Sequence, residues 1–224
     1  MELLSNDVAL YVVIAIAILF VLGYAIGAKY NYRLQRKIWK VMSEELKKYS
    51  KSVSLKKLGS GGFAILCSRL GSLDKTEIDV VLSSREIILY YLVTRLRGIT
   101  DKLYIHADFP KQPPFKMEMF KKGSKYTRTS LQSLEKLTDI VLEGIPNQLE
   151  VKTTNEKIGL ELLSDKQLLK KLSATVNFLE RVSIAEEHPQ LSILSELSQE
   201  TIISLIDLAI TIGNSMAKIT RRRK

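Results

Sequence analysis

The sequence is poor in the residues that most catalytic and metal-binding sites use. Its 224 residues include one Cys and two His. One Cys excludes an internal disulfide framework, and one Cys with two His leaves too few soft ligands for a structural zinc site. The chain also lacks the Gly-Lys-Ser/Thr ending of a phosphate-binding loop and the G-x-S-x-G sequence of a nucleophile elbow. We therefore expect no enzyme activity, no metal and no cofactor.

The few side chains that could act as nucleophile or base lie where the sequence gives them no catalytic partner. Cys67 is placed among apolar residues of a predicted strand, which favours a buried, inert thiol over a nucleophile. His106 also lies in a predicted strand, and His188 precedes a proline in a turn. A hydrolase built around His106 or Cys67 would need a concave pocket that brings other polar groups to them. Three acids near Lys75 favour a solvated turn over a divalent-cation site: Asp74, Glu77 and Asp79.

Residues 8–28 form an apolar run without a single charge, VALYVVIAIAILFVLGYAIGA. Twenty-one helical residues span about 31 Å, which is the thickness of a bilayer core. A buried core helix is the alternative, but the run is apolar on every face and lies at one end of the chain, which favours a membrane span. A cleaved signal peptide would carry basic residues before a shorter apolar stretch. Here the only charged residues before the run are the acids Glu2 and Asp7. The run predicts a retained transmembrane helix.

The flanks of this run predict its orientation. Glu2 and Asp7 precede it, and five bases follow it within twelve residues. Because Lys and Arg concentrate on the cytoplasmic side of a span, we expect residues 1–7 outside and the C-terminal bulk in the cytoplasm. Four aromatic residues near the inner end fit the interfacial belt: Tyr24, Tyr30, Tyr32 and Trp39.

The net charge of +10 is concentrated beside the predicted span. Residues 29–57 hold ten bases and two acids, a net +8. Three interpretations are open: topology together with anionic lipid, phosphate contacts to ribosomal RNA, or a solvated face with no partner. No base-reading motif is present, so RNA would be gripped through its backbone. The candidate ribosome or lipid contacts are Lys29, Arg33, Arg36, Lys37, Lys40, Lys218, Arg221, Arg222, Arg223 and Lys224.

Beyond the span we expect three parts: a basic juxtamembrane helix within 29–57, an α+β domain over 58–198, and a C-terminal helix with a basic tail over 199–224. Apolar residues recur every three or four positions over 29–51, which predicts a helix there. The glycine cluster at 59–62 predicts a hinge after it.

The domain itself reads as four tandem β-β-α units, with an antiparallel sheet covered by helices on one face. Alternating apolar and polar residues predict the strands, while glycines and capping residues mark helix ends. The predicted strands are 63–70, 77–83, 102–109, 115–121, 148–154, 158–163, 181–187 and 191–197. The predicted helices are 85–97, 125–143, 165–179 and 199–220.

Several short motifs follow one another in a recognisable order along the chain. The predicted span leads into the basic-aromatic exit Gly27-Ala28-Lys29-Tyr30-Asn31-Tyr32. A strand ending Cys67-Ser68-Arg69 follows, and then a helix from Arg85-Glu86 to Arg95-Leu96-Arg97. The step Ile145-Pro146-Asn147 and the closing helix with its basic tail complete the order, which covers roughly residues 20–224. In this order of features the chain resembles the calumin family, the coiled-coil-domain-containing subunit of the PAT complex at the multipass translocon.

The resemblance implies a non-catalytic factor that works beside a SecY-type Sec translocon and the ribosome. Such a factor assists insertion or folding of multi-spanning membrane proteins, with an Oxa-type insertase and a small membrane chaperone as partners. Two family features are missing here: a long acidic lumenal region and a long C-terminal coiled coil. The compact chain would be a minimal form of the family, such as an archaeal one. The alternative is a membrane-tethered scaffold that binds anionic lipid and a soluble partner, without a ribosome role.

Overall fold

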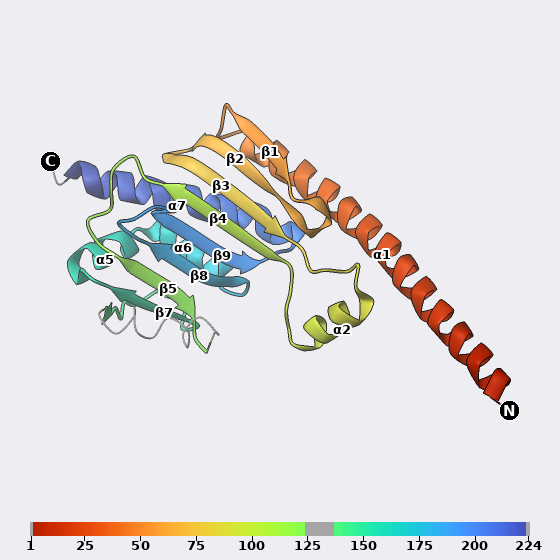
Figure 1. Ribbon diagram of the computed structural model, residues 1–224. Coiled ribbons are helices and arrows are strands. Elements are labelled where there is room, and N and C mark those ends of the chain that lie inside the picture. The colour runs from red at the N-terminus through yellow and green to blue at the C-terminus, as the bar shows by residue number, and fades with distance from the viewer. Residues whose placement is uncertain (1, 124–136, 223–224) are drawn as a thin grey trace.

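The computed structural model describes residues 2–123 and 137–222, without the side chains of residues 2–7. One nine-stranded sheet dominates it, and helices α1, α5, α6 and α7 lie against one of its faces (Figure 1). The predicted α+β class is confirmed. The helices are α1 (Glu2–Leu46), α2 (Ile88–Leu96), α5 (Glu156–Leu163), α6 (Lys166–Thr175) and α7 (Gln199–Arg222). The strands are β1 (Val53–Lys57), β2 (Gly62–Leu70), β3 (Leu73–Val81), β4 (Lys102–Asp108), β5 (Met117–Lys121), β6 (Thr138–Asp139), β7 (Leu149–Thr153), β8 (Leu179–Ile184) and β9 (Leu191–Glu196).

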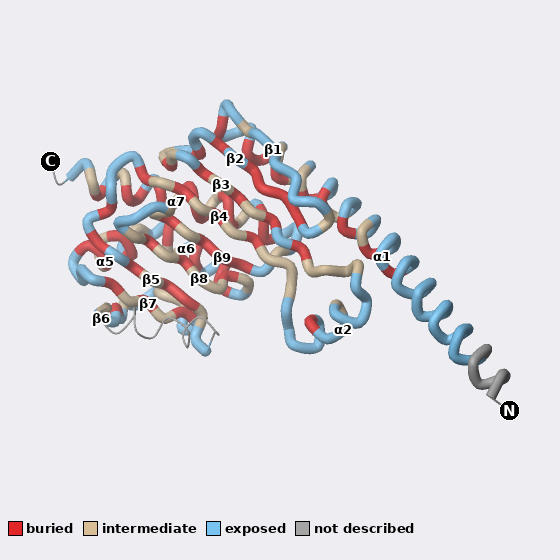
Figure 2. Tube along the Cα trace, viewed as in Figure 1, coloured by how far each residue is buried: buried red, intermediate tan, exposed pale blue. Residues whose placement is uncertain are grey.

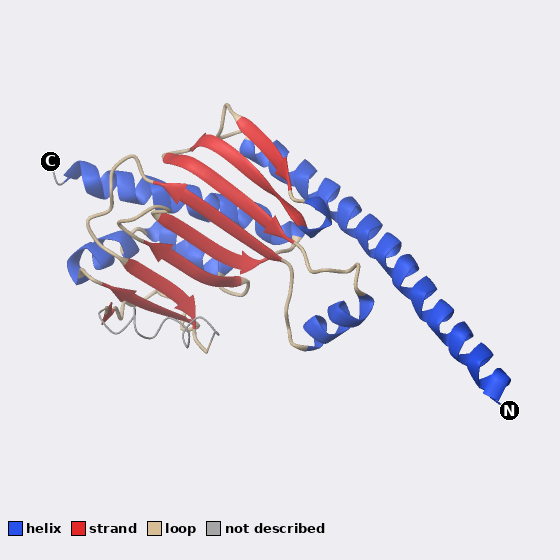
Figure 3. Cartoon of the chain, viewed as in Figure 1, coloured by secondary structure: helices blue, strands red, loops and turns tan. Residues whose placement is uncertain are grey.

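The strands follow the order β1-β2-β3-β4-β9-β8-β5-β7-β6, and each neighbouring pair is antiparallel. Successive side chains of a strand point to opposite faces. In β4, Leu103, Ile105 and Ala107 are buried, whereas Tyr104 and His106 between them are half-buried. The sheet therefore has a covered face against the helices and a more open face, which Figure 3 shows in front.

Helix α1 is one continuous helix of 45 residues, which includes the apolar run 8–28 and most of the helix predicted over 29–51. Residues 8–22 of this helix are exposed, while its C-terminal part, from Asn31 onward, packs against the domain (Figure 2). Ile38, Met42 and Leu46 are fully buried there, one turn apart on one side of the helix. The helix ends at Leu46, earlier than predicted, because β1 begins at Val53 and pairs with β2.

Two described helices are long and apolar enough to cross a membrane, α1 and α7. The most apolar window of α1 has a mean hydropathy of 2.7 and is 6% buried. The corresponding window of α7 has a mean hydropathy of 1.5 and is 61% buried. Helix α7 is therefore the central core helix, and α1 carries the unpacked apolar segment.

The covered face of the sheet and α7 form the centre of the core. The stripe predicted on the C-terminal helix is buried at every position: Ile202, Leu205, Ile206, Ala209, Ile212 and Met216. Gly213 permits close approach of α7 to the β2–β3 turn. A Cβ at this position would lie 2.8 Å from both Leu73 Cγ and Ser72 Oγ.

The strand predicted over 158–163 is wrong, because this segment belongs to helix α5. The Asn155 side chain accepts a hydrogen bond from the Ile158 backbone N–H at 3.2 Å and caps the helix. Ile158, Leu162 and Leu163 are buried on one side. The apolar residues of the run IGLELL fit both the strand period of two and the helix period of 3.6. The Asn155 cap stabilises the helix.

The helix predicted over 125–143 is also wrong at its C-terminal end. Thr138–Asp139 form strand β6, which pairs with β7, and residues 140–142 are extended or irregular. Residues 125–136 of this prediction lie outside the described part of the chain. A third difference concerns the helix predicted over 85–97. Residues 85–87 form a turn, and α2 begins only at Ile88.

Candidate functional site

The basic residues of α1 form a stripe that points away from the domain. Its members are exposed: Lys29, Arg33, Arg36, Lys37 and Lys40. At 100° per residue they fall within an arc of about 100°. The residues of α1 that the domain buries lie on the opposite side of the helix: Asn31, Gln35, Ile38 and Met42. We call the five bases the basic stripe, and no part of the described domain covers it.

The predicted basic tail lies elsewhere. Figure 1 shows the end of α7 and the start of α1 at opposite ends of the molecule. Lys218 Nζ lies 3.3 Å from Asp165 Oδ2, and Arg222 Nη1 lies 3.8 Å from Glu161 Oε1. Arg221 is exposed on the last turn of α7. Arg223 and Lys224 lie outside the described residues. The fold thus separates the two groups of predicted contacts, and it pairs part of the tail with acids of the domain.

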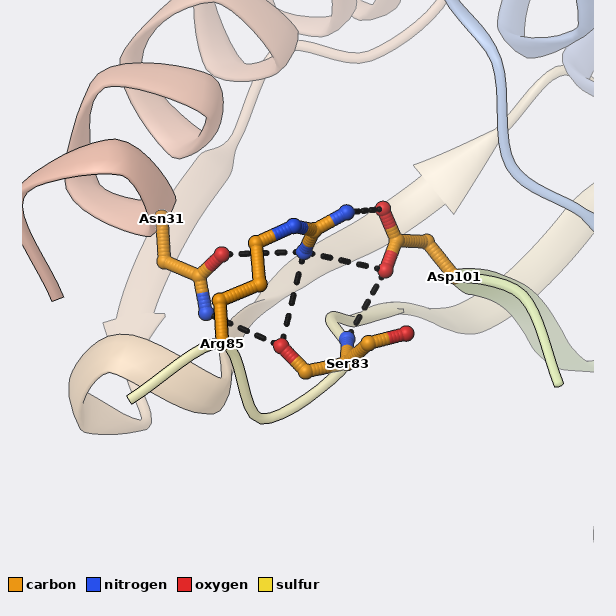
Figure 4. Close-up of polar contacts among 4 residues, drawn as sticks. All are labelled: Asn31, Ser83, Arg85 and Asp101. Carbon is orange, nitrogen blue, oxygen red and sulfur yellow. Dashed lines mark hydrogen bonds and ion pairs between the residues drawn. The ribbon is translucent and has the colours of Figure 1, made fainter. Parts of the chain in front are cut away.

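A polar network joins α1 to the loop that carries α2 (Figure 4). Arg85 Nη2 lies 2.7 Å from Asp101 Oδ2, and Arg85 Nη1 donates to Asp101 Oδ1 at 3.2 Å. Arg85 Nη1 also donates to Asn31 Oδ1 at 2.9 Å. Asn31 Nδ2 in turn donates to the Ser83 carbonyl at 3.1 Å, and the Ser83 N–H donates to Asp101 Oδ1 at 2.8 Å. We call these four residues the Arg85 network.

The Arg85 network is largely removed from solvent, and this sets the charge state of its acid. Burial alone would raise the pKa of Asp101, but hydrogen bonds from Arg85 and Ser83 outweigh it and hold that pKa below its usual value. Arg85 also stacks against two aromatic rings, at 5.2 Å from the centroid of Tyr30 and 5.3 Å from that of Tyr91. The network therefore ties both ends of the α2 loop to α1 through an ionised pair.

The glycine cluster at 59–62 lies beside α1 and is held to it. Gln35 Nε2 donates to the Gly59 carbonyl at 2.9 Å and to the Ser60 carbonyl at 3.1 Å. Gly62 has a φ of 145°, and a Cβ there would lie 1.9 Å from the Val80 carbonyl oxygen. These glycines serve a tight turn packed against a helix, where the sequence predicted a hinge.

Cys67 and His106 cannot form a joint catalytic site, because the sheet separates them. Cys67 is buried on the covered face, and burial raises the pKa of its thiol. His106 lies on the open face, where its Nδ1 is 2.9 Å from Ser192 Oγ. His188 is exposed, with Nδ1 2.7 Å from Asp108 Oδ1. Among the described residues, no group of three or more His, Cys, Asp or Glu could hold a metal ion.

The open face carries a row of polar side chains that no local pattern in the sequence predicts. Register places Glu77 beside His106, then Ser192, Ser183 and Glu118 on successive strands. Ser183 Oγ donates to Glu118 Oε1 at 2.7 Å, and Arg181 pairs with the same carboxylate at 2.8 Å. Each strand contributes one member, so only the strand order reveals the row. Its groups mostly bond one another.

A hollow of about 630 Å³ lies between α2 and this open face. Tyr90, Thr94 and Arg97 line it from α2 and its C-terminal cap. Lys102 and Glu180, which form an ion pair, line it from the sheet. Three bases and two acids line it in all, and Lys102 and Glu180 pair with each other, so the wall carries no strong charge of one sign.

No family model and no curated protein matches the chain. Among solved structures, it is similar to the mycobacterial trehalose monomycolate transport factor A, TtfA. The alignment has 12% sequence identity and a TM-score of 0.39, and it covers 80% of this chain and 95% of that chain. A likeness at this level carries no statement about what the present protein does.

Proposed function

We propose that the protein is a non-catalytic, membrane-anchored factor that docks on the ribosome beside a SecY-type translocon and assists multi-spanning membrane proteins. In this proposal residues 8–28 cross the membrane, and the domain lies in the cytoplasm, as the flanking charges predict. The unpacked apolar half of α1 supports the span. The Sec channel, the Oxa-type insertase and the small membrane chaperone enter as partners through the resemblance to the calumin family.

The observation that carries the proposal is the position of the basic stripe. Lys37 and Lys40 follow the end of the span by nine and twelve residues, which places them about 14 and 18 Å beyond the hydrocarbon along the helix. The headgroup layer is only about 5–8 Å thick on each side. A tilt of about 20° changes these heights little. The outer bases therefore stand in water, facing away from the domain, where they can reach phosphates of a large complex on the membrane surface.

Rigidity adds to this argument. One unbroken helix carries both the span and the stripe, and the Arg85 network and Gln35 fix the domain to it. The stripe is consequently held at one height rather than presented on a flexible linker. A fixed row of cations suits backbone contacts to RNA, whose strength comes from counterion release.

The second candidate is a scaffold on anionic lipid. Lys29 and Arg33 favour it, because they lie about 2 and 8 Å beyond the span and reach the headgroup layer. The two candidate functions thus use different parts of the basic stripe. The inner bases, Lys29 and Arg33, lie near lipid headgroups, and the outer bases, Lys37 and Lys40, lie beyond them. Substituting only the outer pair therefore separates them.

The test is a pull-down of tagged full-length protein from native membranes in mild detergent, at low and at high salt. Ribosomal RNA and the SecY-type channel are quantified for the wild type and two variants. The first variant is Lys37→Glu with Lys40→Glu. The matched control is Lys166→Glu with Lys170→Glu, which reverses two exposed lysines on α6, away from the stripe.

We expect RNA and channel to co-purify at low salt, and RNA to leave at high salt while the channel stays. The stripe variant should lose RNA at low salt, and the control should retain it. Equal recovery of RNA with the two variants would show that Lys37 and Lys40 of the basic stripe do not contact the ribosome. Recovery of neither RNA nor channel at any salt, with binding to anionic vesicles intact, would favour the lipid scaffold.

A further inference from the structure

We propose that α2 is an interfacial membrane helix, whose apolar face lies in the hydrocarbon of the leaflet where the α1 span ends. The domain would then be attached to the bilayer by two elements rather than one. This inference rests on the proposed span of α1 and is independent of the ribosome.

The composition and exposure of α2 motivate the inference. The helix ILYYLVTRL has nine residues, and five large apolar side chains share an arc of about 140° at 100° per residue. All five are exposed, and Leu96 is 89% exposed. Tyr91 and Thr94, on the other side, face the domain. The exposed set is Ile88, Leu89, Leu92, Val93 and Leu96. A single exposed Leu needs no explanation, but a contiguous apolar face marks an interaction site.

The contacts of α2 with α1 give its depth. A Cβ at Gly23 would lie 2.8 Å from Ile88 Cδ1, and a Cβ at Gly27 would lie 2.2 Å from the Arg85 carbonyl oxygen. The two glycines, one turn apart, thus form a groove in α1 that holds the segment before α2. Ile87 also lines a shallow hollow together with Phe20 and Tyr24.

Those contact residues lie inside the span. The apolar run ends at residue 28, so Gly23 is about 7–8 Å inside the hydrocarbon boundary. The run has 21 residues, and about 20 are needed to cross, so the boundary cannot move to the N-terminal side of Gly23. Ile88 touches the helix at that depth. Amphipathic interfacial helices bury their apolar faces by about 5–10 Å, which is the depth found here.

The residues that flank the apolar face of α2 are of the types that lie in the headgroup layer. Arg95 and Arg97 are exposed at the C-terminal end of α2, and Tyr90 is 55% exposed. Cations and tyrosines are the side chains that anchor helices at this level. The Arg85 network fastens the loop to α1 at Asn31, three residues beyond the span. Continuity with the span and these flanking charges identify lipid as the occupant of the apolar face.

The test measures the depth of fluorescent labels on the full-length chain in pure phosphatidylcholine vesicles. An environment-sensitive fluorophore is attached to Leu92→Cys or to Leu96→Cys. Ile14→Cys, inside the span, is the lipid control, and Val141→Cys, 95% exposed on the domain, is the water control. Native Cys67 is buried and is retained, and wild type treated with the same fluorophore is the blank. Each label is quenched either by spin-labelled lipid or by aqueous iodide.

We expect the labels at Leu92 and Leu96 to match Ile14, with blue-shifted emission, quenching by spin-labelled lipid and loss of iodide quenching. If they match Val141 while Ile14 stays in lipid, the inference is overturned and the span survives. If the labels at Leu92 and Leu96 are protected from iodide only in native membranes, the apolar face binds a protein partner, and the inference is also overturned. Iodide quenching at Ile14 itself would overturn the span, and the inference with it.

Discussion

Removing the Asp101 carboxylate should destabilise the domain far more than removing an acid from a surface ion pair. The Asp101 and Arg85 side chains are 13% and 16% exposed, and Asp101 also accepts the Ser83 N–H. Truncating one partner of a buried pair typically costs about 3–5 kcal/mol, because the other charge stays buried. Since the pair retains some solvent contact, we expect Asp101→Ala to lower the free energy of unfolding by about 2–4 kcal/mol.

The matched control is Asp74→Ala. Asp74 pairs with Arg69 at 3.3 Å on the same sheet, but these side chains are 36% and 68% exposed. Exposed pairs contribute about 0–1 kcal/mol, so the control should stay within that range. Asp101→Ala and Asp74→Ala each remove the carboxylate that pairs with an arginine. The two ion pairs differ mainly in how far they are buried.

Cys67 supplies the assay. It is the one cysteine of the chain and is buried in the core, so its thiol becomes reactive when the domain unfolds. The full-length protein in mild detergent is equilibrated in urea, and unfolding is followed by pulsed labelling of this thiol. Free energies come from linear extrapolation. Equal losses for the two variants, or a loss below about 1 kcal/mol for Asp101→Ala, would refute the reasoning.

The remaining predictions use the same assay. Gly27→Ala should destabilise the domain by about 1–3 kcal/mol despite the better helix propensity of alanine, because its Cβ would meet the Arg85 backbone. Gly61→Ala, with nothing within 4 Å of its Cβ, should be nearly neutral, and a loss equal to that of Gly27→Ala would contradict the packing argument. The pKa of Asp101 is lowered in the fold. The stability that wild type holds over Asp101→Asn should therefore be constant from neutral pH to about 5, begin to fall near the unfolded-state pKa of about 4, and be lost as the pH falls through the lower folded-state pKa. A stability difference that grows on acidification would contradict this sign. Leu46→Ala, at a fully buried position of α1, should cost about 2–5 kcal/mol, and a loss below 1 kcal/mol would mean that α1 is not part of the core.

Local patterns in the sequence predict much of this architecture. Alternation in residues 102–109 and 115–121 places strands β4 and β5, and the stripe from Ile202 to Met216 places the core face of α7. These elements have one buried face each, so their period is visible in the sequence. The run IGLELL lacks that clarity, and only the Asn155 cap distinguishes helix from strand.

The Arg85 network and the open-face row could not be found in the same way. Asn31, Arg85 and Asp101 are far apart in the sequence, and they meet only because α1 packs beside the end of β3 and the start of β4. Exposed apolar residues of α2 read as an ordinary amphipathic helix until the contact between Gly23 and Ile88 sets their depth. The basic stripe could be identified from sequence, but its direction away from the domain needed the buried face of α1.

The most direct measurement is the salt dependence of ribosome binding by full-length protein in nanodiscs of zwitterionic lipid, which excludes attraction to anionic headgroups. Each phosphate contact contributes about 0.7–0.9 to the slope of log affinity against log salt. We predict a steep slope for wild type and for Lys166→Glu with Lys170→Glu, and a slope flatter by about 1.4–1.8 for Lys37→Glu with Lys40→Glu. Ribosome binding that is absent in wild type, or whose slope is the same in both variants, would contradict the account.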